Sequence, residues 1–165
     1  MKNYSLSTFL LSVLFLGFNS CCSKDDENPC TNFPFLGGEI TVNGVVEKLS
    51  IAQLSSNLGD SYAMYLFQIV SISSDCKRQN ILSLKIDLHS STELEGTHQI
   101  KTFSSANEAS GNFTTQQVSP VSQSSFELES GTVKITELGV KKYTIDVNAT
   151  DVEGGKVSLL LTDQF

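Results

Sequence analysis

Residues 81–89 read ILSLKIDLH and alternate strictly in character. Every second residue from Leu82 to Leu88 is leucine or isoleucine, and the residues between them are serine, lysine and aspartate. Successive side chains of a β-strand point to opposite faces of a sheet. This stretch therefore predicts a half-buried strand whose apolar face lies on a core.

The same period of two continues on both sides of this strand. Upstream, Glu39–Val42 alternates and ends in Asn43-Gly44, a pair typical of a type I′ hairpin turn. We expect strands near residues 39–42, 45–54, 62–72, 81–89, 97–102, 125–129, 132–137, 142–149 and 157–161. Short strands at regular spacing predict an all-β fold, an antiparallel β-sandwich of about eight to nine strands. A small up-and-down β-barrel of lipocalin-like form is the alternative.

Two stretches depart from simple alternation. Residues 62–72 (YAMYLFQIVSI) are apolar on both faces, and Tyr65, Phe67 and Ile69 share one of them. That face either builds the core or forms a contact site for a sugar or a protein. Residues 103–123 are rich in Ser, Thr, Asn and Gln. They predict either a long functional loop or an edge strand over 114–118.

The first twenty residues have the pattern of a signal peptide. Lys2 precedes an apolar stretch from Leu6 to Phe18, interrupted only by small or hydroxyl-bearing residues. A bilayer span needs about 20 apolar residues, so this stretch is too short to cross a membrane. Its length suits the apolar region of a signal peptide that is removed on export.

The junction after that stretch resembles the lipobox of bacterial lipoproteins. It reads Phe18-Asn19-Ser20-Cys21, and the resemblance implies that Cys21 carries a lipid, with Cys22 as the rival position. The residues that follow resemble the export signal of Bacteroides-type surface lipoproteins; they are Ser23, Lys24, Asp25, Asp26 and Glu27. The resemblance implies a signal peptide over 1–20 and a lipidated acidic tether over 21–32. The alternation described above predicts a β-sandwich domain over 33–165.

Two further cysteines, Cys30 and Cys76, follow the junction. Compartments beyond the inner membrane are oxidising, so a disulfide between them is plausible. The loop that it would close makes such a bridge worth roughly 4 kcal/mol in the chain-entropy model. Connectivity cannot be deduced from sequence, and two free thiols or a bridge to Cys22 are the alternatives.

Catalytic and metal-binding patterns are largely missing from the sequence. There is no Gly-x-Ser-x-Gly motif and no Cys-x-x-Cys pair. His89 and His98 could approach each other across one turn, but no ligand spacing supports a metal site there. We therefore expect no enzyme activity, no cofactor and no metal.

The formal net charge of −7 argues against nucleic acid as a partner, because such binders need a basic surface. The leading hypothesis is an outer-membrane lipoprotein, facing the cell exterior, that acts as a non-catalytic binding or structural module. Its partners would be the membrane, through the lipid anchor, and a glycan or a protein. A barrel-like carrier of an apolar ligand and an enzyme with an unrecognised site are the alternatives.

Overall fold

The computed structural model describes residues 34–89, 93–103, 105–118 and 120–165 of the chain. The described part contains nine β-strands. They are β1 (Gly38–Val42), β2 (Val45–Leu58), β3 (Tyr62–Ile72), β4 (Arg78–His89), β5 (Gly96–Lys101), β6 (Glu108–Val118), β7 (Val121–Gly139), β8 (Lys142–Asp151) and β9 (Lys156–Gln164). The all-β fold class is confirmed.

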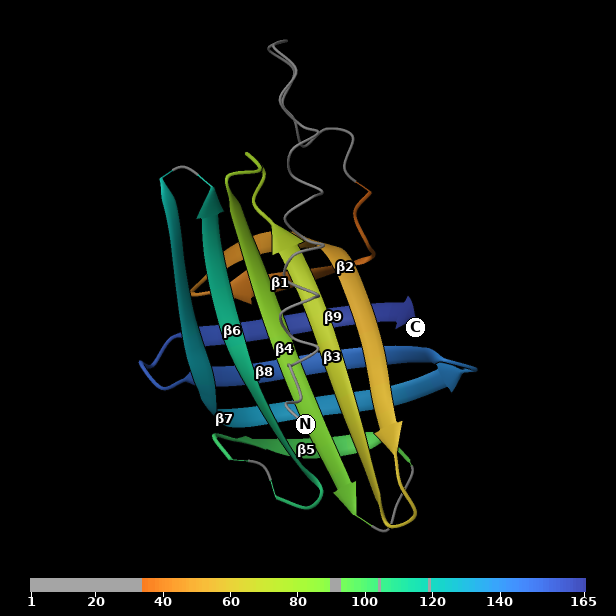
Figure 1. Cartoon of the computed structure of the whole chain (residues 1–165). Coiled ribbons are helices and arrows are strands. Elements are labelled where there is room, and N and C mark those ends of the chain that lie inside the picture. The colour runs from red at the N-terminus through yellow and green to blue at the C-terminus, as the bar shows by residue number, and fades with distance from the viewer. Residues whose placement is uncertain (1–33, 90–92, 104, 119) are drawn as a thin grey trace, which may run out of the picture. The chain divides into compact units, whose positions relative to one another are not determined.

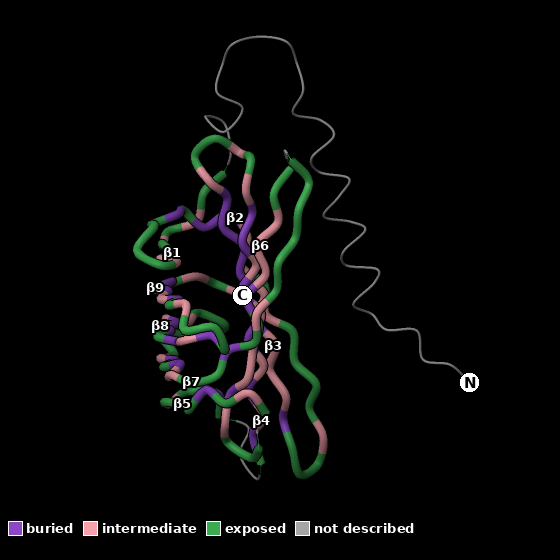
Figure 2. Tube along the Cα trace, turned by 90° about the vertical axis from the view of Figure 1, so that its left-hand side faces the viewer, coloured by how far each residue is buried: buried purple, intermediate pink, exposed green. Residues whose placement is uncertain are grey.

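The strands pair in the order β1-β2-β3-β4-β6-β5-β7-β8-β9, and β1 also pairs with β9. All pairings are antiparallel except a single parallel bridge between β5 and β6. Figure 1 shows that β3, β4, β6 and most of β2 run across the direction of β5, β8, β9 and the second part of β7. The edge-on view of Figure 2 shows the same two groups as two facing layers. The sheet is therefore folded over on itself as a sandwich.

Two long strands connect the layers. The first part of β2 pairs with β1 and the rest pairs with β3, with a bulge between Leu49 and Ile51. The first part of β7 pairs with β6 and the rest pairs with β5 and β8, with a bulge between Leu128 and Ser130. Crossed β-layers are typically joined by strands that change layer at a bulge. Each layer keeps open edges where these two strands leave it.

Glycine is required at one of these corners. Gly131 follows the β7 bulge with a φ of +134°, which L side chains rarely adopt. A Cβ atom there would lie 2.1 Å from the carbonyl oxygen of Asn148 on the neighbouring strand. The close approach of β7 and β8 therefore depends on the missing side chain.

The core lies between the layers and consists of one continuous cluster. From β4 it takes the four residues that the alternation predicts, Leu82, Leu84, Ile86 and Leu88. The opposite layer contributes residues of the same alternating kind, such as Ile145, Val147, Leu159 and Leu161. The half-buried strand predicted at residues 81–89 is thus confirmed.

The structure corrects three expectations. Residues 125–129 and 132–137 belong to a single strand, β7, rather than to two. Residues 108–118 form strand β6, so the predicted long loop is wrong; a strand covers 114–118 as the alternative expected, but it is paired with β4 and β7 and is not an edge strand. The proposed contact face of Tyr65, Phe67 and Ile69 lies inward: Phe67 and Ile69 are fully buried and Tyr65 packs against the core.

Candidate functional site

A buried acidic side chain lies where β2, β3 and β4 meet. Glu47 is only 5% exposed. Its Oε2 accepts hydrogen bonds from the Ser71 hydroxyl, at 2.7 Å, and from the Asn80 side-chain amide. Its Oε1 accepts from the Arg78 guanidinium, whose Nε lies 3.0 Å away. The Thr115 hydroxyl donates to Asn80 Oδ1 at 2.7 Å. Both carboxyl oxygens thus have partners, as burial of such a group requires.

The strand register explains why this network forms. Ser71 lies opposite Asn80, and Asn80 lies opposite Thr115, so the three side chains share the inner face of the layer. The next rung toward the core is apolar and consists of Ile69, Leu82 and Phe113. The inner face therefore changes from apolar to polar within one alternation step.

An open pocket of about 380 Å³ adjoins this network. Arg78 belongs to both, because its guanidinium bonds Glu47 while the residue also lines the pocket. The lining is polar throughout and consists of Ser73, Ser74, Asp75, Lys77, Arg78 and Gln117. It offers hydroxyl, amide, carboxylate, ammonium and guanidinium groups within one hollow.

The turn between β3 and β4 carries most of this lining. Asp75 Oδ1 accepts hydrogen bonds from the Ser73 hydroxyl at 2.6 Å and from the Lys77 backbone N–H at 3.1 Å. The Ser73 bond, followed by the Lys77 backbone bond, lowers the pKa of the Asp75 carboxyl below its usual value of 3.8. The turn therefore presents an ionised carboxylate beside the cations of Lys77 and Arg78 throughout the neutral pH range.

Cys76 lies in the same turn, with a positive φ of 55°, and is disulfide-bonded. Cys21, Cys22 and Cys30 all lie outside the described residues. The pairing of Cys76 with Cys30 therefore stays a prediction.

A second open hollow, of about 400 Å³, lies over β1, β8 and β9. Its lining is Thr41, Gly44, Asn148, Ala149, Thr150, Lys156, Val157 and Ser158. Lys156 is the one charged residue in that lining. This hollow lacks the convergent charges and the supporting buried network of the first, so we take the pocket at Arg78 as the candidate site.

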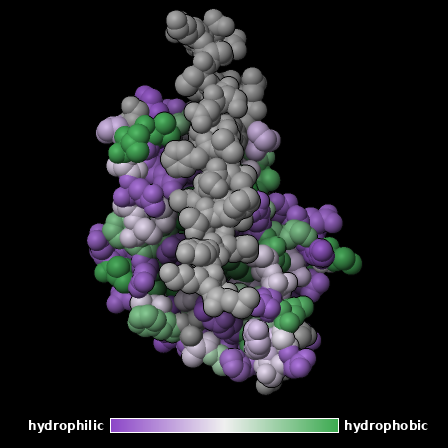
Figure 3. Space-filling model, viewed as in Figure 1, coloured by the Kyte–Doolittle hydropathy of each residue, from purple (hydrophilic) through white to green (hydrophobic). Residues whose placement is uncertain are grey.

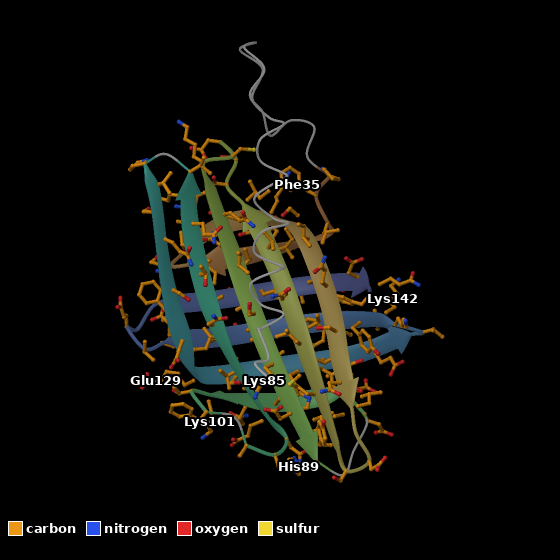
Figure 4. All side chains as sticks on the ribbon, viewed as in Figure 1. Phe35, Lys85, His89, Lys101, Glu129 and Lys142 are labelled. Atoms are coloured by element: carbon orange, nitrogen blue, oxygen red, sulfur yellow. The ribbon has the colours of Figure 1, made fainter. Side chains whose placement is uncertain are left out.

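The two histidines, His89 and His98, differ in burial. His98 is buried and its Nε2 lies 3.1 Å from the Leu94 carbonyl oxygen. His89 is exposed at the end of β4 (Figure 4), whereas Arg78 is the first residue of that strand. Among the described residues, no group of three or more His, Cys, Asp and Glu side chains is placed to hold a metal ion.

Tyr143, which lies outside the pocket lining, has a perturbed pKa. Tyr143 is half-buried, and its ring centroid lies 6.3 Å from that of Phe165. Burial, with smaller effects of Glu137 and Tyr65, raises the pKa of its phenol above 10.0. The group stays protonated at neutral pH and supplies no base.

Among the described residues, Cys76 is the one predicted site residue that lies in the turn lining the pocket. Cys21, Cys22 and residues 23–27 lie outside the described residues, and Tyr65, Phe67 and Ile69 belong to the core side of β3. Sequence reasoning missed Glu47 and its partners. The sequence did contain a signal for Glu47. It lies two residues before Leu49, which is buried, so the alternation places its acidic side chain on the same inward face.

Comparison of this chain with protein-family models, with curated proteins and with solved structures finds no match. In the part of the chain that the structure describes, no helix is long and apolar enough to cross a bilayer. The function is therefore argued from the chain's own residues.

Proposed function

We propose that this chain is an outer-membrane lipoprotein, exposed at the cell surface, whose β-sandwich binds a polar ligand and catalyses no reaction. The signal-peptide pattern, the lipobox-like junction at Cys21 and the acidic export-like segment support the anchoring and the location. The polar pocket beside Glu47 carries the binding role. A glycan is the ligand class whose chemistry fits it best.

The pocket supports glycan binding through its mixture of donors and acceptors. A sugar ring presents hydroxyl groups that both donate and accept, so a lining of one charge sign alone would leave some of them unpaired. Lys77 and Arg78 donate, Asp75 accepts, and the Gln117 amide does both. Arg78 is held in place by Glu47, so its orientation is set before a ligand arrives.

The apolar-carrier alternative needs an interior cavity. The space between the layers is occupied by the buried cluster of isoleucine, leucine, valine and phenylalanine side chains. Both pockets described above are open to solvent, and the pocket at Arg78 is lined by no member of that cluster. In the view of Figure 3, hydrophobic and hydrophilic residues are interspersed over the visible described surface. These observations favour a surface-binding module over a carrier.

We expect Lys77→Ala and Gln117→Ala each to weaken glycan binding about tenfold, which corresponds to ~1.4 kcal/mol. Each change removes hydrogen-bonding groups from the pocket and leaves Glu47 and its partners intact. The measurement is a screen of neutral and acidic oligosaccharides, followed by calorimetric titration of the best binder.

Lys134→Ala is the matched control, because Lys134 is an exposed lysine on β7 outside the pocket lining. It should bind like the parent chain. Equal affinities of all three variants for a glycan that the parent binds would place the site elsewhere. A screen without any binder would remove the glycan assignment.

A further inference from the structure

The second half of β2 forms an open edge of the sandwich. Residues Val45–Lys48 pair with β1, and Lys48–Leu58 pair with β3 on the other side of the strand. The Leu36 N–H reaches the Leu49 carbonyl at 2.8 Å, but no described segment pairs with that side of residues 52–58. Unpaired N–H and C=O groups along such an edge are a template for another strand.

One backbone hydrogen bond at the end of β2 shows which residues face outward. The Gly59 N–H donates to the Tyr62 carbonyl at 2.8 Å, so Gly59 directs its backbone groups toward β3. Backbone direction alternates along an antiparallel strand. Asn57, Ser55 and Gln53 therefore also face β3. The residues whose N–H and C=O point to the open edge are Ala52, Leu54, Ser56 and Leu58.

This edge is free of charge. Residues 51–58 read IAQLSSNL and contain no charged residue and no proline. Natural proteins usually protect exposed edges with charged residues, proline or bulges. The other open edge of the same layer, at the start of β7, is bounded by Pro120 and Glu127, and residues 121–126 between them are likewise uncharged. Among the described residues, no strand pairs with the open side of residues 52–58 of β2, which are regular in their pairing with β3.

We propose that this edge pairs with the same edge of a second copy of the chain. Each copy carries a formal charge of −7, so contact between copies is least opposed where both surfaces are uncharged. Outward groups must meet outward groups, and the register that pairs all four outward residues sets Leu54 opposite Ser56 and Ala52 opposite Leu58. The twofold axis then passes beside Ser55. The proposal is independent of the glycan site, which lies on other residues.

The register makes Ser55 the position that faces itself. Ser55 is exposed, and a pair of this non-hydrogen-bonded kind has Cα atoms about 4.5 Å apart, within the range for a disulfide. Under mild oxidation, full-length Ser55→Cys should give a covalent dimer well above the background of the parent chain. The readout is non-reducing electrophoresis of the purified protein in nonionic detergent.

Gln53→Cys and Asn57→Cys are matched controls with a sharper outcome. In this register, residue 53 lies four positions, roughly 13 Å, from residue 53 of the second copy, and the same holds for residue 57. Residue 53 of one copy lies directly opposite residue 57 of the other. Neither variant alone should crosslink above background, and an equal mixture of the two should. Crosslinking of all three variants alone, or of none above the parent, would overturn the proposal.

A second pair of variants tests the edge without a crosslink. Ser56→Pro removes an N–H that faces the open edge and leaves pairing with β3 intact. Ser56→Ala keeps that N–H. In sedimentation analysis, the parent and Ser56→Ala should have twice the mass of the monomer, and Ser56→Pro should be monomeric. A parent chain that is monomeric at every concentration, or that forms open-ended polymers, would contradict the twofold pairing.

Discussion

Glu47→Ala is expected to lower the free energy of unfolding by about 3 kcal/mol. The change removes the acceptor of two buried donors, the Ser71 hydroxyl and the Asn80 amide. A buried donor without a partner costs about 1–3 kcal/mol. The loss of the Arg78 ion pair adds less to the decrease in unfolding free energy, because the Arg78 side chain is 37% exposed and regains hydration when Glu47 is lost. Urea denaturation, followed by circular dichroism, measures the change.

Glu39→Ala is the matched control for this substitution. Glu39 lies on β1 beside the same corner but is exposed. Its removal should change the stability by no more than about 0.5 kcal/mol. If both variants were equally stable, the buried network would not be a structural element, and the account of how Arg78 is positioned would fail with it.

Phe67→Ala is expected to cost about 4 kcal/mol of stability. Phe67 is fully buried, and its ring packs edge-to-face on Phe165 with centroids 5.7 Å apart. Truncation removes the transfer free energy of the ring and leaves a cavity that neighbouring strands cannot close. The same denaturation experiment applies, and the loss should appear as a lower midpoint with an unchanged slope.

Leu66→Ala separates the two faces of β3. Leu66 is next in the chain, points to the opposite face and is half-buried. Its truncation should cost about 1 kcal/mol. Near-equal losses at the two positions would mean that the face of Phe67 is no more buried than its opposite, against the packing described above.

Alternation alone was enough to predict the all-β fold and the strands on either side of the core. It worked at residues 82–88 of β4 because every inward residue there is a large aliphatic one. It failed at β6, where Ala109 and Phe113 are the buried apolar residues and most other positions carry serine, threonine, asparagine or glutamine. Hydropathy has no period in such a strand, although its backbone pairs as regularly as that of β4.

The alternation pattern failed to predict the bend of β7 for a different reason. The sequence Glu129-Ser130-Gly131 reads as a turn, because glycine and serine commonly end strands. The structure uses the same residues for a bulge that carries one strand from the first layer into the second. Whether glycine ends a strand or bends it depends on which strands lie beside it, and this is a tertiary property.

The candidate site was only partly predictable. The phase of Glu47 within β2 is visible in the sequence, and it indicates an inward acidic residue. Its partners come from β3 and β4, and Gln117 comes from β6. Those strands are neighbours in the sheet, but β5 lies between β4 and β6 in the chain. The order of pairing, and therefore the composition of the pocket, follows from the fold rather than from any local motif.

Surface exposure is tested most directly by protease treatment of intact cells that produce the parent chain, Cys21→Ala, or the triple alanine variant of Lys24, Asp25 and Asp26. The account predicts that the parent is degraded on intact cells. The triple variant should be protected until the outer membrane is opened, and Cys21→Ala should be lost from the membrane fraction. A parent chain that is protected on intact cells, and degraded only after the outer membrane is opened, would contradict the assignment to the cell surface.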